Sequence, residues 1–318
     1  MSSIHYLNPS KESLHGFFSR EMEAALTIDQ GDTVIFKTLD ASWGMEPRKA
    51  PGEARVKFTD ISPERKPSGF GHSLVGPVFI KGAEPGRVLE VRINEIVPDG
   101  YGWTSAGGFP SYWNKKLGFD QEEELTLDFK LDSTLMVGES LFGNFPYSVK
   151  LNPFMGIMGV APAEKGEHST LKPSYWGGNL DCKELRAGST LYLPISVEGG
   201  LFSTGDGHAV QGDGEVSGPA LECGMERVSL TFNINENLNI KRPIAKTNEG
   251  WLTMAFHEDL EEAMWLALSD MLDFMASLYG ISRVEAYALA TMAVDLRVTQ
   301  IVNVRKGVHA FLPFGAVR

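Results

Sequence analysis

The sequence contains few cysteines and no long apolar run, and both shortages narrow the class of protein. Only two cysteines, Cys182 and Cys223, occur in 318 residues, which is too few for a disulfide framework. No apolar run approaches the length of a membrane span, and the first residues show no basic segment followed by an apolar one. The sequence therefore predicts no membrane helix, no secretory signal and a reduced, cytoplasmic protein.

Positive charge is also scarce. The 29 Lys and Arg residues are outnumbered by 41 Asp and Glu residues, which gives a formal net charge of −12. This charge argues against nucleic acid or an anionic membrane as the main partner. Hydrophobic residues make up 42% of the chain, so we expect a packed core, in one large domain or two.

Several familiar catalytic motifs are missing. The sequence has no HExxH and no CxxC motif. The pair Gly205/Gly207 does not open a helical pattern, so it is no dinucleotide fingerprint. The segment 71–76 has the wrong spacing around its serine for a nucleophile elbow. Cys182 is a candidate thiol nucleophile, although a lone cysteine is more often a small buried apolar residue.

Residues 1–245 show the pattern of an antiparallel β-sandwich or barrel. Short runs of β-branched and aromatic residues, such as 33–38, 88–96 and 125–129, alternate with turns rich in Gly, Pro and Asp. The 34 glycines and 17 prolines fit many turns. We therefore expect a β-rich region that carries the functional site.

Residues 246–318 predict an α+β region packed on the first. Apolar residues recur at helical spacing from His257 to Tyr279, and Gly280 is a plausible end. A capping box at Ser282 opens a second helix, to about Val294. The runs 299–303 and 308–312 follow as a terminal hairpin. The fold class is thus mainly β with an α+β C-terminal part.

The segment from Gly205 to Glu215 concentrates polar chemistry between two strand-like runs, 189–197 and 228–234. It holds one histidine, His208, and three carboxylates separated by glycines. The carboxylates are Asp206, Asp213 and Glu215. Histidine nitrogen and carboxylate oxygen together suit a divalent metal of the zinc type. The segment reads as a glycine-rich loop on a β scaffold, and the alternative is an ordinary solvated turn.

Two other turns offer side chains that complete a metal site. The segment 69–72 ends in His72, and the segment 177–181 ends in Asp181. A catalytic zinc needs three protein ligands and an open position. His72, Asp181 and His208 can supply the ligands if the three segments converge.

Segments along most of the chain resemble the acetamidase/formamidase family. The matching segments are 31–34, 38–41, 71–78, 82–86, 177–181, 205–222, 286–287, 295–303, 307–310 and 312–313. The resemblance implies hydrolysis of a short amide such as formamide or acetamide to the acid and ammonia. It also implies a β-rich sandwich with an α+β C-terminal part, oligomers, and similarity of some members to zinc-dependent hydrolases. The glycine- and serine-rich signature of the Ser-Ser-Lys amidases is absent.

Amide chemistry then suggests roles for the candidate residues. A metal polarises the carbonyl and acidifies water, and a carboxylate moves the proton from water to nitrogen. We assign metal binding to His72, Asp181 and His208, with Asp206 as a further ligand. We assign general acid/base catalysis to Glu215 or Glu222. Asp213 is a candidate for a residue that supports these groups.

Other interpretations stay open at this stage. A metal-independent amidase could use Cys182 or a carboxylate-activated water. A β-rich module that binds a metal or a carbohydrate without catalysis is the alternative of another class. Calcium is less favoured than zinc because the Asp-x-Asp spacing of an EF-hand loop is absent and His208 is central. The expected partners are a small amide and a second copy of the chain, in a homodimer or dimer of dimers.

Overall fold

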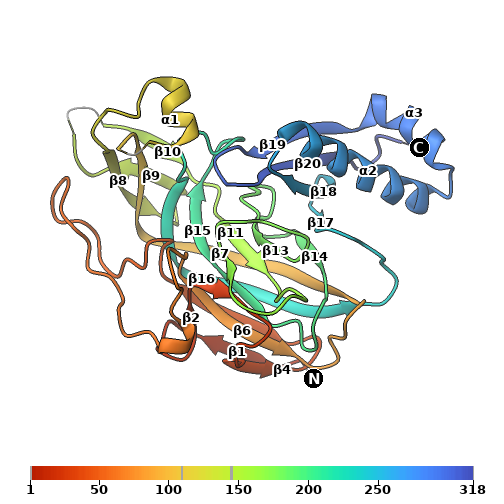
Figure 1. Cartoon of the computed structure of the whole chain (residues 1–318), viewed down its shortest axis with the longest axis horizontal. Coiled ribbons are helices and arrows are strands. Elements are labelled where there is room, and N and C mark those ends of the chain that lie inside the picture. Colours follow the sequence, from red (N-terminus) through yellow and green to blue (C-terminus); the bar gives the residue numbers. More distant parts are fainter. Residues whose placement is uncertain (1, 109, 144–145, 318) are drawn as a thin grey trace.

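β-Strands dominate the computed structural model, which describes residues 2–108, 110–143 and 146–317 (Figure 1). The described part is 41% strand and 13% helix. The prediction of a mainly β fold followed by two helices and a terminal hairpin is confirmed, although the first hairpin strand lies at Asp295–Gln300 and not at the predicted 299–303. No helix in the described ranges has the length and apolarity to cross a membrane.

The first half of the chain forms short strands, one strand of 19 residues and one short α-helix. The elements are β1 (Ile4–Leu7), β2 (Leu14–His15), β3 (Phe17–Phe18), β4 (Leu26–Ile28), β5 (Thr33–Thr38), the 3₁₀ turn η1 (Pro63–Arg65), β6 (Leu74–Ile80), β7 (Val88–Ala106), α1 (Tyr112–Leu117), β8 (Leu125–Asp132) and β9 (Val137–Ser140). The predicted strand 33–38 coincides with β5. The predicted strand 88–96 is the first half of β7, which continues past Pro98 because a partner strand of 15 residues pairs with it on both sides of that proline.

The middle of the chain supplies the strands that surround the candidate site. They are β10 (Ser148–Lys150), β11 (Phe154–Gly159), β12 (His168–Ser169), β13 (Gly177–Asn179), β14 (Thr190–Pro194), β15 (Phe202–Val210), β16 (Leu221–Asn235) and β17 (Ile244–Lys246). β15 pairs antiparallel with β6, β11 and β16 along different parts of its length. It therefore lies at the centre of the β-rich region.

Most strands of the described chain join one large, predominantly antiparallel sheet. The pairs β1–β5 and β4–β6 are parallel, and β3 and β12 form a separate small sheet. The core against the sheet is aromatic and aliphatic, with Phe36, Phe202 and Phe232 in mutual ring contact at 5.0–6.4 Å between centroids. Burial of this apolar surface is the main source of stability that holds β15 in place.

The C-terminal elements form an α+β layer of their own, drawn in blue in Figure 1. They are β18 (Gly250–His257), α2 (Leu260–Tyr279), α3 (Arg283–Ala293), β19 (Asp295–Gln300) and β20 (Lys306–Pro313). Asp259 caps the N-terminus of α2, and Gly280, at φ 66°, ends the helix in the left-handed conformation. The predicted capping box between Ser282 and Glu285 opens α3.

Hydrogen bonds join the C-terminal layer to the β-rich region. β17 pairs with β14 on one side and with β18 on the other. Its bounds, Ile244–Lys246, include the position where the sequence changes character. The division of the chain into domains at residue 245 remains a prediction.

The interpretation of Gly205–Val210 as a loop is wrong, because these residues lie in strand β15. The two glycines that suggested a turn serve close packing. A Cβ on Gly205 would lie 2.1 Å from the carbonyl oxygen of Ser73, and one on Gly207 would lie 2.7 Å from that of Cys223. Glycine inside a strand thus marks the close approach of neighbouring backbones rather than the end of the strand.

Candidate active site

Two neighbouring strands bring Asp206, His208 and Glu222 together. Asp206 and His208 are two positions apart on β15, and Glu222 on β16 is the cross-strand partner of His208. His208 Nε2 lies 3.5 Å from Asp206 Oδ1 and 3.3 Å from Glu222 Oε1. All three side chains are buried. We call them the strand triad.

A second group shares His208 with the strand triad. It adds Asp181, which follows β13, and Glu215, which lies in the loop after β15. In each group the ligand atoms lie within 4.8 Å of one another, and all the members are buried. The structure therefore brings two carboxylates from each group to one imidazole.

Three of these carboxylate residues have a backbone conformation that is uncommon without glycine. Asp181, Asp206 and Glu215 have φ values of 48°, 57° and 48°. Non-glycine residues in this left-handed region carry conformational strain that the surrounding structure must hold in place. The strain coincides with the converging carboxylates, as is typical of functional sites.

Gln211 fixes the orientation of the His208 imidazole by a contact with its Nδ1. The sequence did not single out Gln211 as a site residue. The Nε2 of Gln211 donates to the carbonyl oxygens of Asp181 at 2.8 Å and Thr299 at 3.5 Å. Its Oε1 lies 3.0 Å from His208 Nδ1. Asn303 was also missed as a site residue, and its Nδ2 donates to Asp181 Oδ2 at 2.7 Å.

Space for the strand triad depends on a glycine in β11. A Cβ on Gly156 would lie 2.7 Å from Asp206 Oδ2 and 2.8 Å from His208 Cε1. Any larger residue at this position would displace the two side chains. The imidazole also packs edge-on against Phe154, with 5.0 Å between ring centroids. The site is therefore formed by the packing of β11 against β15.

The site opens into a cavity of about 290 Å³ that His72 also lines. Asp206, Glu215 and Glu222 lie along the same cavity. His72 Nδ1 is 2.9 Å from Thr170 Oγ1, and His72 belongs to neither of the two groups around His208. Larger hollows of 480 and 410 Å³ lie on the C-terminal helices, away from these carboxylates.

Asp213 is placed apart from the other predicted site residues. Its carboxylate forms an ion pair with Lys183, at 2.8 Å, and its side chain is 42% exposed. It does not line the cavity and belongs to neither group around His208. The structure therefore brings together five of the seven predicted residues around His208, places His72 on the same cavity, and leaves Asp213 outside.

Comparison with known proteins identifies the family of the chain. The model of the acetamidase/formamidase family matches residues 4–169 and 163–316. The chain belongs to this family. An acetamidase of Mycolicibacterium smegmatis is 28% identical over 200 residues, covering 46% of this chain and 49% of that protein. A formamidase of Methylophilus methylotrophus is 27% identical over 195 residues, covering 46% and 47%.

Solved structures extend the likeness of this acetamidase/formamidase family member to its whole length. The crystal structure of an acetamidase from Bacillus halodurans superposes with a TM-score of 0.81 at 29% identity, covering 97% of both chains. By sequence alignment the chain spans only 47–60% of the length of the curated relatives that it matches.

Burial shifts the protonation of the site carboxyls in this acetamidase/formamidase family member. Loss of solvation raises the pKa of Asp181 to about 7 and that of Glu222 to about 8. In both cases the charge of Asp206 adds to the increase, and His208 opposes it. Burial, together with the charge of Asp181, also holds the pKa of Glu215 well above its usual range. Nearby negative charge and loss of water therefore favour protonated carboxyls here.

The charges of Asp206 and His208 stabilise each other. Burial disfavours the charged form of Asp206, but His72 and His208 outweigh it and lower its pKa. Burial disfavours the charged form of His208 in the same way, and Glu222 and Asp206 outweigh it, so its pKa lies well above 6.5. Asp206 is thus held charged beside His208 while burial favours the protonated form of the other carboxyls, and a cation bound among them would favour their ionised form.

The residues around His208 fit a divalent metal. Asp181 Oδ1, Asp206 Oδ1, His208 Nε2 and Glu222 Oε2 are buried and have no hydrogen-bond partner among the described residues. A buried polar atom without a partner costs about 1–3 kcal/mol. One imidazole nitrogen with carboxylate oxygens is a donor set that zinc accepts. These buried groups are therefore able to hold a metal ion.

The two cysteines of the family member are buried and protonated. Both have 0% exposure, and burial raises the pKa of each thiol well above 9. Cys182 Sγ donates to Glu184 Oε2 at 3.4 Å, and neither cysteine lines the cavity. A nucleophilic cysteine needs a thiolate in an electropositive and accessible setting. The thiol alternative therefore has no support in this environment.

Replacing either thiol is expected to leave turnover substantially intact. In Cys182→Ser and Cys223→Ser the hydroxyl enters a dry site, which lowers the free energy of unfolding by about 1–3 kcal/mol without touching the cavity. Rates of ammonia release and thermal melting would separate activity from stability. Complete loss of turnover in a folded Cys182→Ser protein, with an acyl-thioester trapped in the wild type, would establish the thiol mechanism instead.

Proposed function

We propose that this protein is a cytoplasmic amidohydrolase that cleaves the C–N bond of a short carboxamide, giving a carboxylate and ammonia. The observation that carries the proposal is the strand triad in a chain of the acetamidase/formamidase family: it is buried, its Asp206 has a strained backbone, and Asp206 and Glu222 line a cavity. The names of its relatives, acetamidase and formamidase, give the substrate class. The unpaired, buried cysteines support the compartment.

The proposal includes a zinc ion held by His208 and Asp206, with Asp181 and His72 as further ligands. A zinc ion bound there supplies Lewis acidity to a carbonyl oxygen and to water. Support comes from the unpaired atoms at three of these residues and from the position of His72 on the same cavity. Nitrogen and oxygen ligands of this type are ordinary for zinc.

Glu222 and Glu215 are the proposed acid/base residues. Both are buried and both line the cavity, so each is within reach of a substrate amide and of water. One carboxylate accepts a proton from the attacking water, and a carboxyl returns a proton to the departing nitrogen. Ala220 N donates to Glu222 Oε1 at 3.0 Å, which orients that carboxyl and leaves Oε2 for the reaction.

Ammonia release from formamide and acetamide tests the proposed function. The purified protein is expected to release one ammonia and one carboxylate for each amide consumed, and a Glu222→Gln variant is expected to lose at least about a hundredfold in kcat. Metal bound at the site without turnover of any amide would identify a binding module instead. Full turnover in a metal-free protein would favour the metal-independent amidase.

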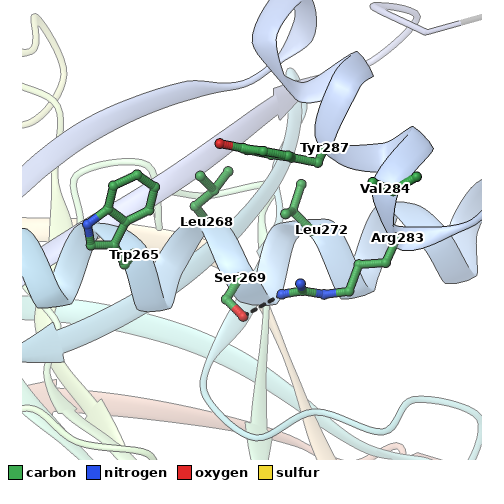
Figure 2. A pocket seen from close by; sticks show the side chains of 7 residues that line it. All are labelled: Trp265, Leu268, Ser269, Leu272, Arg283, Val284 and Tyr287. Atoms are coloured by element: carbon green, nitrogen blue, oxygen red, sulfur yellow. Dashed lines mark hydrogen bonds between the residues drawn. The ribbon is translucent and has the colours of Figure 1, made fainter.

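The proposed assembly is a homodimer or a dimer of dimers that uses the outer face of α2 and α3. The apolar stripe of α2 is largely used within the chain, because Ala267, Met271 and Met275 are buried against β18 and β20. A second apolar surface stays exposed. Figure 2 shows it, with Tyr287 and Val284 of α3 above the side chains of α2. Its residues are Trp265, Leu268, Ser269, Leu272, Arg283, Val284 and Tyr287.

Light scattering at low micromolar concentration is expected to give a mass at least twice that of one chain. Trp265, Val284 and Tyr287 are 47%, 74% and 52% exposed, which is costly for a monomer unless another surface covers them. Of the residues of this surface, Arg283 is expected to weaken the assembly least when it is substituted. Its guanidinium already forms hydrogen bonds to Asp273 and Ser269 within the same chain. A mass near 34.9 kDa would contradict the assembly.

A further inference from the structure

The cavity beside the strand triad is lined by three carboxyl groups, which we call its floor, and by mainly apolar side chains, which we call its walls. The floor is formed by Asp206, Glu215 and Glu222. The walls come from segments far apart in the sequence. They are mainly apolar, with Phe70, Trp103, Trp113, Leu171, Pro219 and Val302, and they also carry polar side chains such as Ser105 and Glu124. An amide needs only the floor. The walls therefore call for a second, apolar part of the ligand.

The aromatic walls are held in place before any ligand arrives. Trp103 Nε1 donates to Asp40 Oδ2 at 3.0 Å, and Asp40 is 2% exposed. The backbone N–H groups of Ser42 and Gly44 donate to the other oxygen of this carboxylate, at 3.0 and 2.9 Å. Trp113 Nε1 donates to the carbonyl oxygen of Ser217 at 3.3 Å. Walls that are ordered in advance add affinity, because less side-chain freedom is lost on binding.

The volume of the cavity exceeds what the smallest amides fill. A cavity volume of this kind needs only about 10–15 Å³ to hold one water, so 290 Å³ leaves room beyond the smallest amides. Formamide has three non-hydrogen atoms and acetamide four. Either one would leave most of the cavity to water against apolar walls. A six-membered aromatic ring attached to the acyl group would fill that space.

Asn179 adds a polar contact suited to a primary amide. It lines the cavity, it is 3% exposed, and its Oδ1 is buried with no hydrogen-bond partner in the described ranges of the chain. Such an oxygen needs a donor. The NH₂ group of a primary amide is such a donor.

We propose that the preferred substrate class is a primary amide whose acyl group carries an aromatic ring, an arylacetamide being the simplest example. The inference rests on the proposed amidase function and extends it from the amide group to the acyl group. The ring packs against Trp103, Trp113 and Phe70, and the carboxamide faces the floor and Asn179. Water oxygen bonds to the carbonyl carbon, the C–N bond breaks, and nitrogen leaves as ammonia with the proton taken from water.

A series of primary amides tests the substrate class. We expect kcat/KM to rise from formamide through acetamide to phenylacetamide, with the last about ten- to a hundredfold above acetamide, as burial of one ring predicts. Hydrolysis of formamide and acetamide with phenylacetamide slower than both would overturn this inference and leave the proposed function standing. No ammonia from any of the three amides would overturn both.

Variants at two neighbouring positions of α1 distinguish a role of the Trp113 side chain in the cavity wall from a general effect of substitution on the protein. Trp113→Ala is expected to lower the ratio of kcat/KM for phenylacetamide to that for acetamide by about tenfold, and Trp113→Phe is expected to restore most of it. Tyr112→Ala is the matched control, because Tyr112 is the neighbouring residue of α1, is 68% exposed and does not line the cavity. An unchanged ratio in a folded Trp113→Ala protein would overturn the assignment of the wall.

A binding measurement gives a result that does not depend on turnover or on the folding of a variant. Phenylacetate, the product of the aryl substrate, is expected to bind the wild-type protein at least about tenfold more tightly than acetate in calorimetric titration. Equal affinity for the two carboxylates would contradict an aromatic subsite.

Discussion

Replacement of His208 by alanine is expected to lower the rate of ammonia release by about a thousandfold or more. The imidazole is the member that the two buried groups share, so its loss removes the common contact of Asp206 and Glu222. It also removes the nitrogen ligand of the proposed zinc site. We expect the fold to survive, because the side chain contributes chemistry while the aromatic and aliphatic core holds β15 in place. Steady-state kinetics with circular dichroism would measure both effects.

His257→Ala is the matched control for this variant. His257 is exposed at the end of β18 and does not line the cavity, so its replacement is expected to leave turnover unchanged. His208→Gln keeps most of the volume of the side chain and guards against a misfolded alanine variant. Near wild-type turnover in either folded His208 variant would assign this histidine an incidental role.

Removal of metal by a chelator is expected to reduce turnover to a small residual level, and added zinc is expected to restore it. The buried carboxylates and the unpaired His208 Nε2 lose their compensating cation when the ion leaves. The loss should also lower the melting temperature, because an ion that binds only the folded protein stabilises it by about 2.7 kcal/mol at a hundred times its dissociation constant. Elemental analysis before and after treatment gives the stoichiometry.

Two controls make the metal experiment decisive. Dialysis without chelator accounts for losses in handling, and magnesium in place of zinc tests selectivity for a nitrogen-containing donor set. The His208→Ala protein should retain less zinc than the wild type. Full activity of a protein that elemental analysis shows to be free of metal would rule out metal assistance.

The sequence predicted regular elements well where local patterns dominate. β5 and the two C-terminal helices with their caps follow directly from alternation, helical spacing and capping residues. The strand β15 was missed because Gly205 and Gly207 carry a turn signal in isolation. Their role depends on the carbonyl oxygens of neighbouring strands, which no local pattern reveals.

The sequence predicted the residue types of the candidate site better than it predicted which of them lie together. Clustering in the sequence identified Asp206, His208 and Glu215, and alternation along a strand explains why the first two share a face. The same clustering suggested Asp213, which the structure pairs with Lys183 instead. Gln211 lies within the segment from Gly205 to Glu215. Its hydrogen-bond partners are 30 and 88 residues away in the sequence, so no local pattern predicted its role.

The amide of Gln211 determines which nitrogen of the imidazole faces the buried carboxyl groups. Its NH₂ group faces two carbonyl oxygens, so only its oxygen is left to meet His208 Nδ1, and that nitrogen must carry a hydrogen. Nε2, the atom beside Asp206 and Glu222, is therefore the nitrogen that is left to bind the proposed zinc ion. A neutral side chain that does not line the cavity thus sets which imidazole nitrogen an ion at the site would meet.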